Sequence, residues 1–250
     1  MKFPPLYLIT DSERLGEEEL IVRVEAAAQG GELMVQLREK QLSDEAFAAL
    51  YRRLRGRLAE SVKIIVNRRV GLVDEFGMDG LQLGAPPSTI RLARKRVASS
   101  IVVGYSAHAV DEAVAAENEG ADFLCYSPVF PPISKTSSLP PVGAEGLREA
   151  CQAVAIPVFA LGGIAPENVA TVKRVGAQGI AVIGAILDAA DPQAAVAALL
   201  ESWSQIETSP KQWETLRCRR GRGREGEAQL TEGLKDGRRN ECSNDRRKDR

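Results

Sequence analysis

The chain has 250 residues, the usual length of one α/β barrel, and is long enough to bury a large core. Aromatic residues make up only 5% of the sequence while Ala, Val, Leu and Gly are common, which favours helices packed on a parallel sheet over a β-sandwich. The formal net charge is −1, no run of 18 apolar residues occurs, and the segment after Met1 is too short for the apolar part of a signal peptide. These features argue against a membrane protein, and we expect a cytoplasmic one.

The cysteine and histidine content argues against several kinds of site. Cys125, Cys151, Cys218 and Cys242 show neither a C-x-x-C pattern nor zinc-ligand spacing, so we expect free thiols in a reducing compartment. His108 is the only histidine, which argues against a histidine-based zinc site and against a Ser-His-Asp triad.

Apolar runs suited to buried parallel strands alternate with helical patterns along the whole chain. The expected strands span residues 6–10, 33–37, 63–66, 80–83, 101–105, 123–127, 158–161 and 179–183. Each is followed by an expected helix, at residues 17–29, 43–58, 70–76, 88–96, 110–119, 143–155, 166–175 and 192–205. Ser43 and Ser88 are the expected N-caps of the second and fourth helices.

A repeated pattern supports this assignment. The segments 77–81, 120–124 and 176–180 each place a helix-ending glycine shortly before a strand, which indicates that the same strand–helix unit is repeated along the chain. Eight such units imply a parallel sheet with right-handed crossovers, and eight strands close a barrel. A doubly wound open sheet is the alternative, but no G-x-G-x-x-G follows the first strand. The sequence therefore predicts a single (β/α)8 TIM barrel over residues 1–206.

The end of the chain has a different composition. Residues 207–250 hold 13 of the 33 Lys and Arg residues but 9 of the 34 Asp and Glu residues, so this tail is locally basic and the body is mildly acidic. The tail lacks apolar residues to bury, and we expect a disordered, low-complexity segment outside the barrel domain. Its Arg-Gly run could contact nucleic acid, but a solvated extension without function is the favoured interpretation, so no nucleic-acid partner is expected.

The segment 158–186 indicates a phosphate site. Gly162 and Gly163 follow a buried strand and allow the backbone to turn tightly and approach a ligand. Pro166 suits the first turn of the next helix, whose free N–H groups favour an anion, and Gly184 closes the last strand. Two consecutive strands ending in glycine match the phosphate site that (β/α)8 barrels form after strands seven and eight. An ordinary turn is the alternative interpretation of the glycine pair.

In a barrel of this kind the active site lies at the carboxyl ends of the strands. The polar residues expected there are Thr10, Asp11, Gln36, Arg38, Lys40, Asn67, Arg68, Arg69, Gln82, Ser106, His108, Ser134 and Lys135. Five of these are Lys or Arg, which implies a substrate with more than one phosphate group or two phosphorylated substrates. Long basic side chains at strand ends can instead simply reach solvent, and for Arg69 the two interpretations are evenly balanced.

Short motifs in these segments become recognisable when taken together. They are LYLITD at 6–11, VQLREK at 35–40, VN at 66–67, GYSAH at 104–108, SPVFP at 127–131, SK at 134–135 and ALGGI at 160–164. In this order, over about residues 6–200, they resemble the thiamine phosphate synthase family and its thiazole tautomerase relatives. The resemblance implies a transferase of thiamine biosynthesis that joins hydroxymethylpyrimidine pyrophosphate to hydroxyethylthiazole phosphate with loss of pyrophosphate. The two phosphorylated small molecules are then its expected partners, and the sequence, which does not determine the oligomeric state, is compatible with a homo-oligomer.

The resemblance also assigns residues to roles. It implies that Gln36 holds the pyrimidine side and that the pyrophosphate is bound by Arg38, Lys40, Asn67, Ser106 and Lys135. It implies that the thiazole phosphate is bound at Ser134, Gly162, Gly163, Ile183 and Gly184.

The sequence departs from the synthases at the metal site. The synthases carry two aspartates that bind Mg²⁺ after strands three and four, and the corresponding positions here hold Arg68 and Pro87. The nearby acidic residues Asp74, Glu75 and Asp79 fall within the third helix or before the fourth strand. Mg²⁺ is therefore not a certain cofactor, no metal ligand is assigned, and Arg68 is the candidate substitute for the charge of the metal.

Loss of the metal ligands leaves other functions open. The tautomerase relatives move a proton on a thiazole phosphate, but their characteristic histidine corresponds to Pro128 here. His108 is the only histidine left for proton transfer, and a structural role in its loop is the favoured interpretation. The retained pyrimidine-side and pyrophosphate residues favour the transferase. A tautomerase-like isomerase and a non-catalytic sensor of thiamine phosphates are the alternatives.

Overall fold

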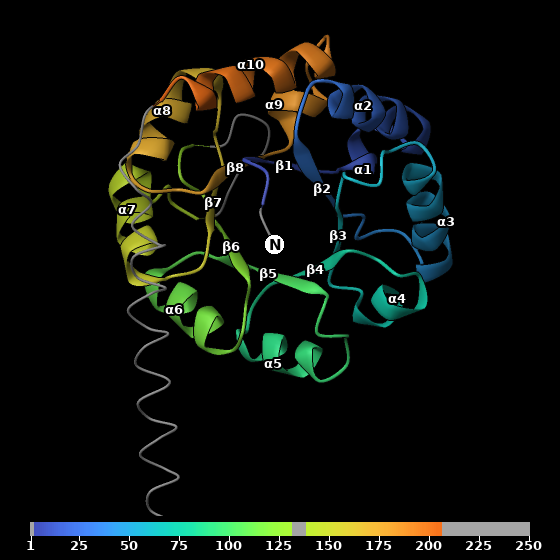
Figure 1. The fold of residues 1–250 in the computed structure, drawn as a ribbon, viewed down its shortest axis with the longest axis horizontal. Helices are drawn as coiled ribbons and strands as arrows, with labels where there is room; N and C mark the ends of the chain where they lie inside the picture. The colour runs from blue at the N-terminus through green and yellow to red at the C-terminus, as the bar shows by residue number, and fades with distance from the viewer. Residues whose placement is uncertain (1–2, 132–138, 207–250) are drawn as a thin grey trace, which may run out of the picture.

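The computed structural model describes residues 3–131 and 139–206, and its centre is a closed barrel of eight parallel strands (Figure 1). Each strand pairs with the next in sequence, and β1 also pairs with β8, which closes the barrel. The strands are β1 (Leu6–Ile9), β2 (Leu33–Leu37), β3 (Ile64–Asn67), β4 (Gly80–Leu83), β5 (Val102–Ala107), β6 (Phe123–Tyr126), β7 (Val158–Leu161) and β8 (Gly179–Val182). The predicted (β/α)8 fold is confirmed.

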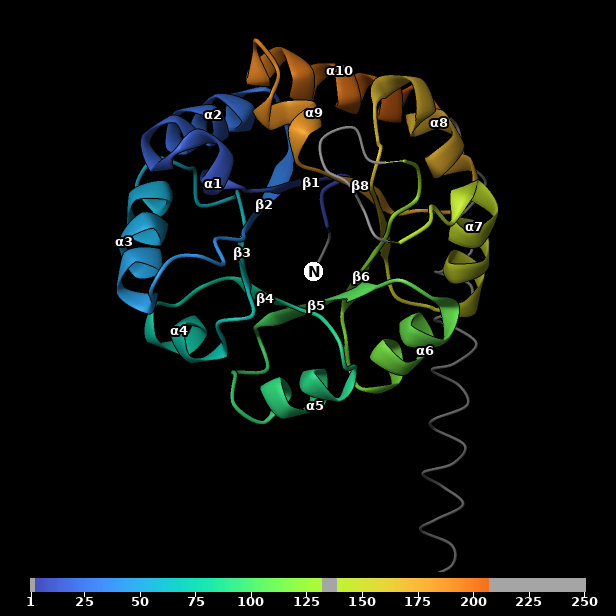
Figure 2. The ribbon, with the colours of Figure 1, turned by 180° about the vertical axis from the view of Figure 1, so that it is seen from behind.

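The helices form an outer ring around these strands, as the view from the opposite end shows (Figure 2). They are α1 (Ser12–Leu15), α2 (Glu17–Gln29), α3 (Asp44–Arg55), α4 (Val70–Glu75), α5 (Ser88–Arg94), α6 (Val110–Asn118), α7 (Gly143–Ala153), α8 (Pro166–Arg174), α9 (Gly184–Leu187) and α10 (Pro192–Ser204). Apolar strand residues that point outward pack against this ring, and those that point inward pack on one another inside the barrel. Both faces of each strand are therefore buried, which explains why the strands read as continuous apolar runs. No helix in the described part of the chain is long and apolar enough to cross a membrane.

Several local predictions were right in detail. Gly77, Gly120 and Gly176, which end helices before a strand, have φ values of 61°, 98° and 106°, the left-handed region that glycine adopts without strain. Ser43 caps α3, since its hydroxyl accepts a hydrogen bond from the N–H of Ala46 at 3.2 Å. The predicted cap at Ser88 was wrong, because the preceding Pro87 is already helical at φ −54° and ψ −31° and Ser88 is the first residue of α5.

Two short helices were not expected from the sequence, α1 after β1 and α9 after β8. Both lie at the carboxyl ends of neighbouring strands. Arg14 at the end of α1 donates to both carboxylate oxygens of Asp188, the residue after α9, at 2.7 Å each. This pair ties the loops after β1 and β8 to each other.

Aromatic side chains close the end of the barrel at which the strands begin. The first described residues run to the middle of the barrel (Figure 1), where the Phe3 ring lies 5.1 Å from Phe123 and 6.1 Å from Phe159. Tyr7 stands above them, with its ring 5.7 Å from Phe123 and 5.9 Å from Phe159. Access to the barrel interior is therefore from the carboxyl ends of the strands.

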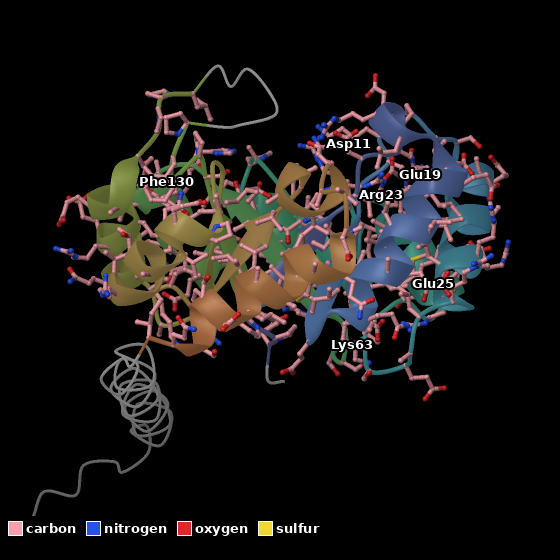
Figure 3. All side chains as sticks on the ribbon, turned by 90° about the horizontal axis from the view of Figure 1, so that it is seen from above. Asp11, Glu19, Arg23, Glu25, Lys63 and Phe130 are labelled. Carbon is pink, nitrogen blue, oxygen red and sulfur yellow. The ribbon has the colours of Figure 1, made fainter. Side chains whose placement is uncertain are left out.

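Figure 3 shows how the two ends differ. Asp11, which follows β1, and Phe130, which follows β6, lie on one side of the barrel, while Lys63, which precedes β3, lies on the other. The tail at 207–250 and the loop residues 132–138 lie outside the described residues. The domain boundary after residue 206 and the disorder of the tail therefore stay predictions.

Candidate active site

A cavity of about 310 Å³ opens at the carboxyl ends of the strands. It is lined by eight of the residues that the sequence predicted at the site, namely Gln36, Arg38, Lys40, Asn67, Arg68, Ser106, His108 and Ile183. The other described lining residues are Ile9, Leu83, Gly84, Ala85, Cys125, Ser127 and Leu161. Ser134 and Lys135 lie outside the described residues, so their assignment stays a prediction.

A chain of hydrogen bonds crosses the barrel beneath this cavity. Asn67 Nδ2 donates to Gln36 Oε1 at 3.3 Å, and Gln36 Nε2 donates to the hydroxyl of Tyr7 at 3.1 Å. The Tyr7 hydroxyl donates to Gln82 Oε1 at 3.4 Å, and Gln82 Nε2 donates to Ser106 Oγ at 3.0 Å. Five strands thus contribute to one polar chain, and its partly exposed ends, Asn67 and Ser106, line the cavity together with Gln36.

Tyr7 is the centre of this chain and was missed by the sequence analysis. Its side chain is fully buried, and burial raises the pKa of its hydroxyl well above 10.0, so the group stays a protonated donor. Because each partner is itself hydrogen-bonded, the amide of Gln36 has one fixed orientation. The only sequence signal was a tyrosine inside an apolar strand.

Gly104 makes room for the chain. A Cβ at this position would overlap the ring of Phe123 and the side-chain oxygen of Gln82. The glycine in β5 is therefore required by the close approach of Gln82 rather than by a turn.

Arg38 and Arg68 present two guanidinium groups to the cavity. Neither side chain has a carboxylate partner among the described residues, whereas most arginines on the outer helices form ion pairs. The Arg38 backbone is fixed because its N–H donates to Thr10 Oγ1 at 2.9 Å. Two unpaired guanidinium groups beside one cavity favour an anionic ligand.

Arg68 has an unusual backbone conformation. Its φ is 63°, and it is the one residue other than glycine with a positive φ in the described part of the chain. Its N–H donates to the carbonyl of Gln82 at 3.0 Å, and a Cβ on Gly84 would lie 3.2 Å from its Nη2 atom. The guanidinium therefore lies between the loops after β3 and β4.

The Arg69 side chain points away from the cavity, so the interpretation as a substrate-binding residue is not supported. Its guanidinium pairs with Asp44 of α3, donates to the carbonyls of Leu42 at 2.5 Å and Glu39 at 3.1 Å, and lies 4.6 Å from the ring centre of Phe47. It is not among the described cavity-lining residues. Arg69 is thus a structural residue that holds the loop after β2.

Glu39 is a buried carboxylate that the sequence analysis did not assign. It is only 1% exposed. It accepts hydrogen bonds from the hydroxyl of Thr10, from the N–H and hydroxyl of Ser12 at 2.8 and 2.5 Å, and from Gln41 Nε2 at 3.2 Å. Glu39 therefore joins the loops after β1 and β2, and through Thr10 it supports the backbone of Arg38.

The glycine pair after β7 has a packing role. Gly162 and Gly163 have φ values of 100° and 61°, and a Cβ on either would overlap or crowd the loop after β6. The backbones of these loops are also joined, since the N–H of Val129 donates to Leu161 O at 2.9 Å and that of Phe130 donates to Gly162 O at 3.0 Å. The glycines bring the two loops together.

The expected phosphate site is only partly in contact with the cavity. Ile183 lines the cavity and is the N-cap of α9, and Gly184 is the first residue of that helix. Gly162, Gly163 and Gly184 are not among the described lining residues. Their role in binding phosphate stays a prediction.

His108 lines the cavity and holds one proton in a defined place. Its Nδ1 lies 2.7 Å from the carbonyl oxygen of Ser127, and a carbonyl oxygen only accepts, so Nδ1 carries the proton. In the neutral tautomer that this bond selects, the lone pair is on Nε2. The histidine ring is thus held by the loop after β6 and also lines the cavity.

The cavity does not offer the ligands that Mg²⁺ requires. Mg²⁺ is bound through carboxylates and other hard oxygen ligands. None of the described lining residues is Asp or Glu, and the sequence at 132–138 contains neither. Asp79 serves the other end of the barrel, where it accepts from Lys63 Nζ at 2.8 Å and from the N–H of Ile64 at 2.9 Å. Within residues 3–131 and 139–206, no group of three or more His, Cys, Asp or Glu residues could hold a metal ion.

Proteins similar in sequence to this chain are named as thiamine-phosphate synthases. A sequence model of the family described as thiamine monophosphate synthase matches residues 6–186. Thiamine-phosphate synthase of Clostridium novyi is 38% identical over 191 residues, which cover 76% of this chain and 94% of that protein. The protein of the same name from Syntrophomonas wolfei is 36% identical over 201 residues, with coverages of 80% and 96%.

A solved structure is also similar to this chain in both sequence and fold. The solved structure of thiamine phosphate pyrophosphorylase from Pyrococcus furiosus matches with a TM-score of 0.70 and 34% identity, covering 80% of this chain and 95% of that chain. The family consists of transferases of thiamine biosynthesis, and this chain belongs to it.

Proposed function

We propose that this protein joins hydroxymethylpyrimidine pyrophosphate to hydroxyethylthiazole phosphate and releases pyrophosphate. The observation that carries the proposal is the set of groups lining one cavity. Arg38, Lys40 and Arg68 supply positive charge, and Asn67 and Ser106 supply neutral hydrogen-bonding groups. Such a set suits a pyrophosphate group attached to an uncharged ring.

In the proposed reaction, the C–O bond between the pyrimidine methylene and the pyrophosphate breaks and both electrons leave with the oxygen. The lone pair of the thiazole nitrogen then forms the new C–N bond to the methylene carbon. Negative charge develops on the departing pyrophosphate, so cationic groups that tighten on it lower the barrier. Gln36, whose amide is fixed by Asn67 and Tyr7, holds the pyrimidine in the orientation that exposes this carbon.

The thiazole phosphate is proposed to bind on the other side of the cavity, where Leu161 and Ile183 line the wall. The glycine turn at Gly162–Gly163 and the start of α9 at Gly184 are the backbone elements assigned to its phosphate. Ser134 and Lys135 are assigned to the same substrates from the loop after β6.

The test is to incubate the purified protein with both substrates and to follow thiamine phosphate by fluorescence after oxidation. Arg38→Gln should lower kcat/KM by about 100-fold, the usual effect of removing one charged donor from a developing anion. Arg148→Gln, which removes an exposed arginine that pairs with Glu145 at 3.0 Å on α7, is the matched control and should change it less than about twofold. Absence of thiamine phosphate under all conditions would disprove the proposal.

His108 supports a second candidate function, proton transfer on a thiazole phosphate. With Nδ1 donating to Ser127, the Nε2 atom is available as a base at the cavity. Incubation of thiazole phosphate tautomers in D₂O would show deuterium incorporation that His108→Gln abolishes. Tight binding of thiamine phosphate with neither reaction would instead identify a sensor.

A further inference from the structure

The charged side chains among the described lining residues of the cavity are all cationic. Three lining side chains, Arg38, Lys40 and Arg68, carry positive charge, and no described lining residue is a carboxylate. Asp11 and Glu39 are buried carboxylates that follow β1 and β2, and neither is a described lining residue. The Glu39 carboxylate already accepts hydrogen bonds from Thr10, Ser12 and Gln41. A divalent cation would find repulsion here and no carboxylate to bind it.

Arg68 is the residue placed to replace such a cation. Its guanidinium lies against Gly84, so it spans the loops after β3 and β4. The left-handed backbone at φ 63° is one that arginine rarely adopts, and such conformations persist where the surrounding structure fixes them for a function. Here the fixing contact is the hydrogen bond from its N–H to Gln82 O at 3.0 Å. Gln82 in turn belongs to the polar chain that reaches Ser106.

We propose that the Arg68 guanidinium is the cation that binds the pyrophosphate group in place of a divalent metal. This inference rests on the proposed function for the identity of its ligand. Arg68 donates hydrogen bonds to the pyrophosphate oxygens from the side of the loops after β3 and β4, while Arg38 and Lys40 approach from the loop after β2. When the methylene C–O bond breaks, the electron pair that moves onto the pyrophosphate is neutralised by these fixed side chains. The reaction then needs no metal to bridge the phosphates.

Binding of inorganic pyrophosphate, measured by isothermal titration calorimetry on the full chain, tests this directly. Titrations are run in EDTA and in MgCl₂. The wild-type protein should bind pyrophosphate in EDTA, and Arg68→Asn should weaken that binding by about 10- to 100-fold, the range for losing hydrogen bonds to a charged group. Arg68→Lys keeps the positive charge but loses the bidentate geometry, so its affinity for pyrophosphate should lie between those of the wild type and Arg68→Asn.

The variants are chosen so that the fold is preserved. Asparagine adopts the left-handed region more readily than arginine, so Arg68→Asn should melt at the same temperature or higher. Arg96→Asn is the matched control, because Arg96 is an exposed arginine after α5 and is not among the described cavity-lining residues. Its pyrophosphate affinity should stay within about twofold of wild type, as expected for a screened surface charge.

Two results of the binding experiment would overturn the inference. One is pyrophosphate binding by the wild-type protein that appears only with Mg²⁺, and the other is unchanged binding by Arg68→Asn in EDTA. The proposed function is judged separately, by whether thiamine phosphate forms. Product that forms only with Mg²⁺ would support the transferase and overturn the metal-free site. Arg68-dependent binding in EDTA without any product would support the site and overturn the transferase.

Discussion

Replacing Tyr7 by Phe removes one hydroxyl from the middle of the buried polar chain and little else. The ring keeps its contacts with Phe123 and Phe159, whose centres lie 5.7 and 5.9 Å away, so no cavity forms. The loss is the two hydrogen bonds to Gln36 and Gln82, at 3.1 and 3.4 Å. A buried polar group left without a partner costs about 1–3 kcal/mol, and we expect the free energy of unfolding to fall by that amount.

Urea unfolding of the Tyr7→Phe variant measures this loss, with Tyr105→Phe as the matched control. Tyr105 is equally buried, but its hydroxyl has no hydrogen-bond partner among the described residues. Removing that hydroxyl should change the free energy of unfolding by less than about 0.5 kcal/mol or raise it. Equal effects of the two substitutions would refute the reasoning, because they would show that the polar chain contributes no more than an unpaired hydroxyl.

Three other predictions follow from the same structure. Burial raises the pKa of Tyr105 to about 12, so this group ionises more readily in the unfolded chain. The free energy of unfolding should therefore fall as pH rises from about 10 towards about 12, and urea unfolding at several alkaline pH values should show a smaller fall for Tyr105→Phe. Gly104→Ala should destabilise the protein by about 1–3 kcal/mol in thermal or urea unfolding, because the added methyl group overlaps Phe123. Glu39→Gln should cost about 1–3 kcal/mol, since an amide cannot accept all the hydrogen bonds that the carboxylate accepts, while the same change at the exposed Glu60 should be near neutral.

The sequence predicted the barrel because its signals are local. Apolar runs of four or five residues and helix-ending glycines each depend on neighbouring residues only, and Gly77, Gly120 and Gly176 all adopt the conformation that the pattern required. The predicted bounds of α2, β2, β4 and β7 agree with the structure. Short helices such as α1 and α9 have only four residues, too few to show a periodic pattern, and so were missed.

The site was predicted less completely because its geometry depends on distant contacts. Eight predicted residues line the cavity, but the hydrogen bond between Tyr7 and Gln82 joins positions 75 residues apart. No local pattern marks such a pair. The glycines at 162 and 163 were predicted to serve a ligand, and the structure shows that they also serve the packing of two loops. A sequence read one segment at a time does not distinguish these roles.

The turn after β3 shows how one strained residue shapes the site. In a regular strand, residues 67 and 69 would share a face and residue 68 would point away. The positive φ of Arg68 breaks this alternation, so Asn67 and Arg68 both line the cavity while Arg69 turns to Asp44 on α3. A left-handed arginine costs about 1–2 kcal/mol relative to the right-handed form. That conformation brings a guanidinium with no carboxylate partner among the described residues to the cavity that Asn67 also lines. The strain at Arg68 therefore fits a role in ligand binding rather than in folding.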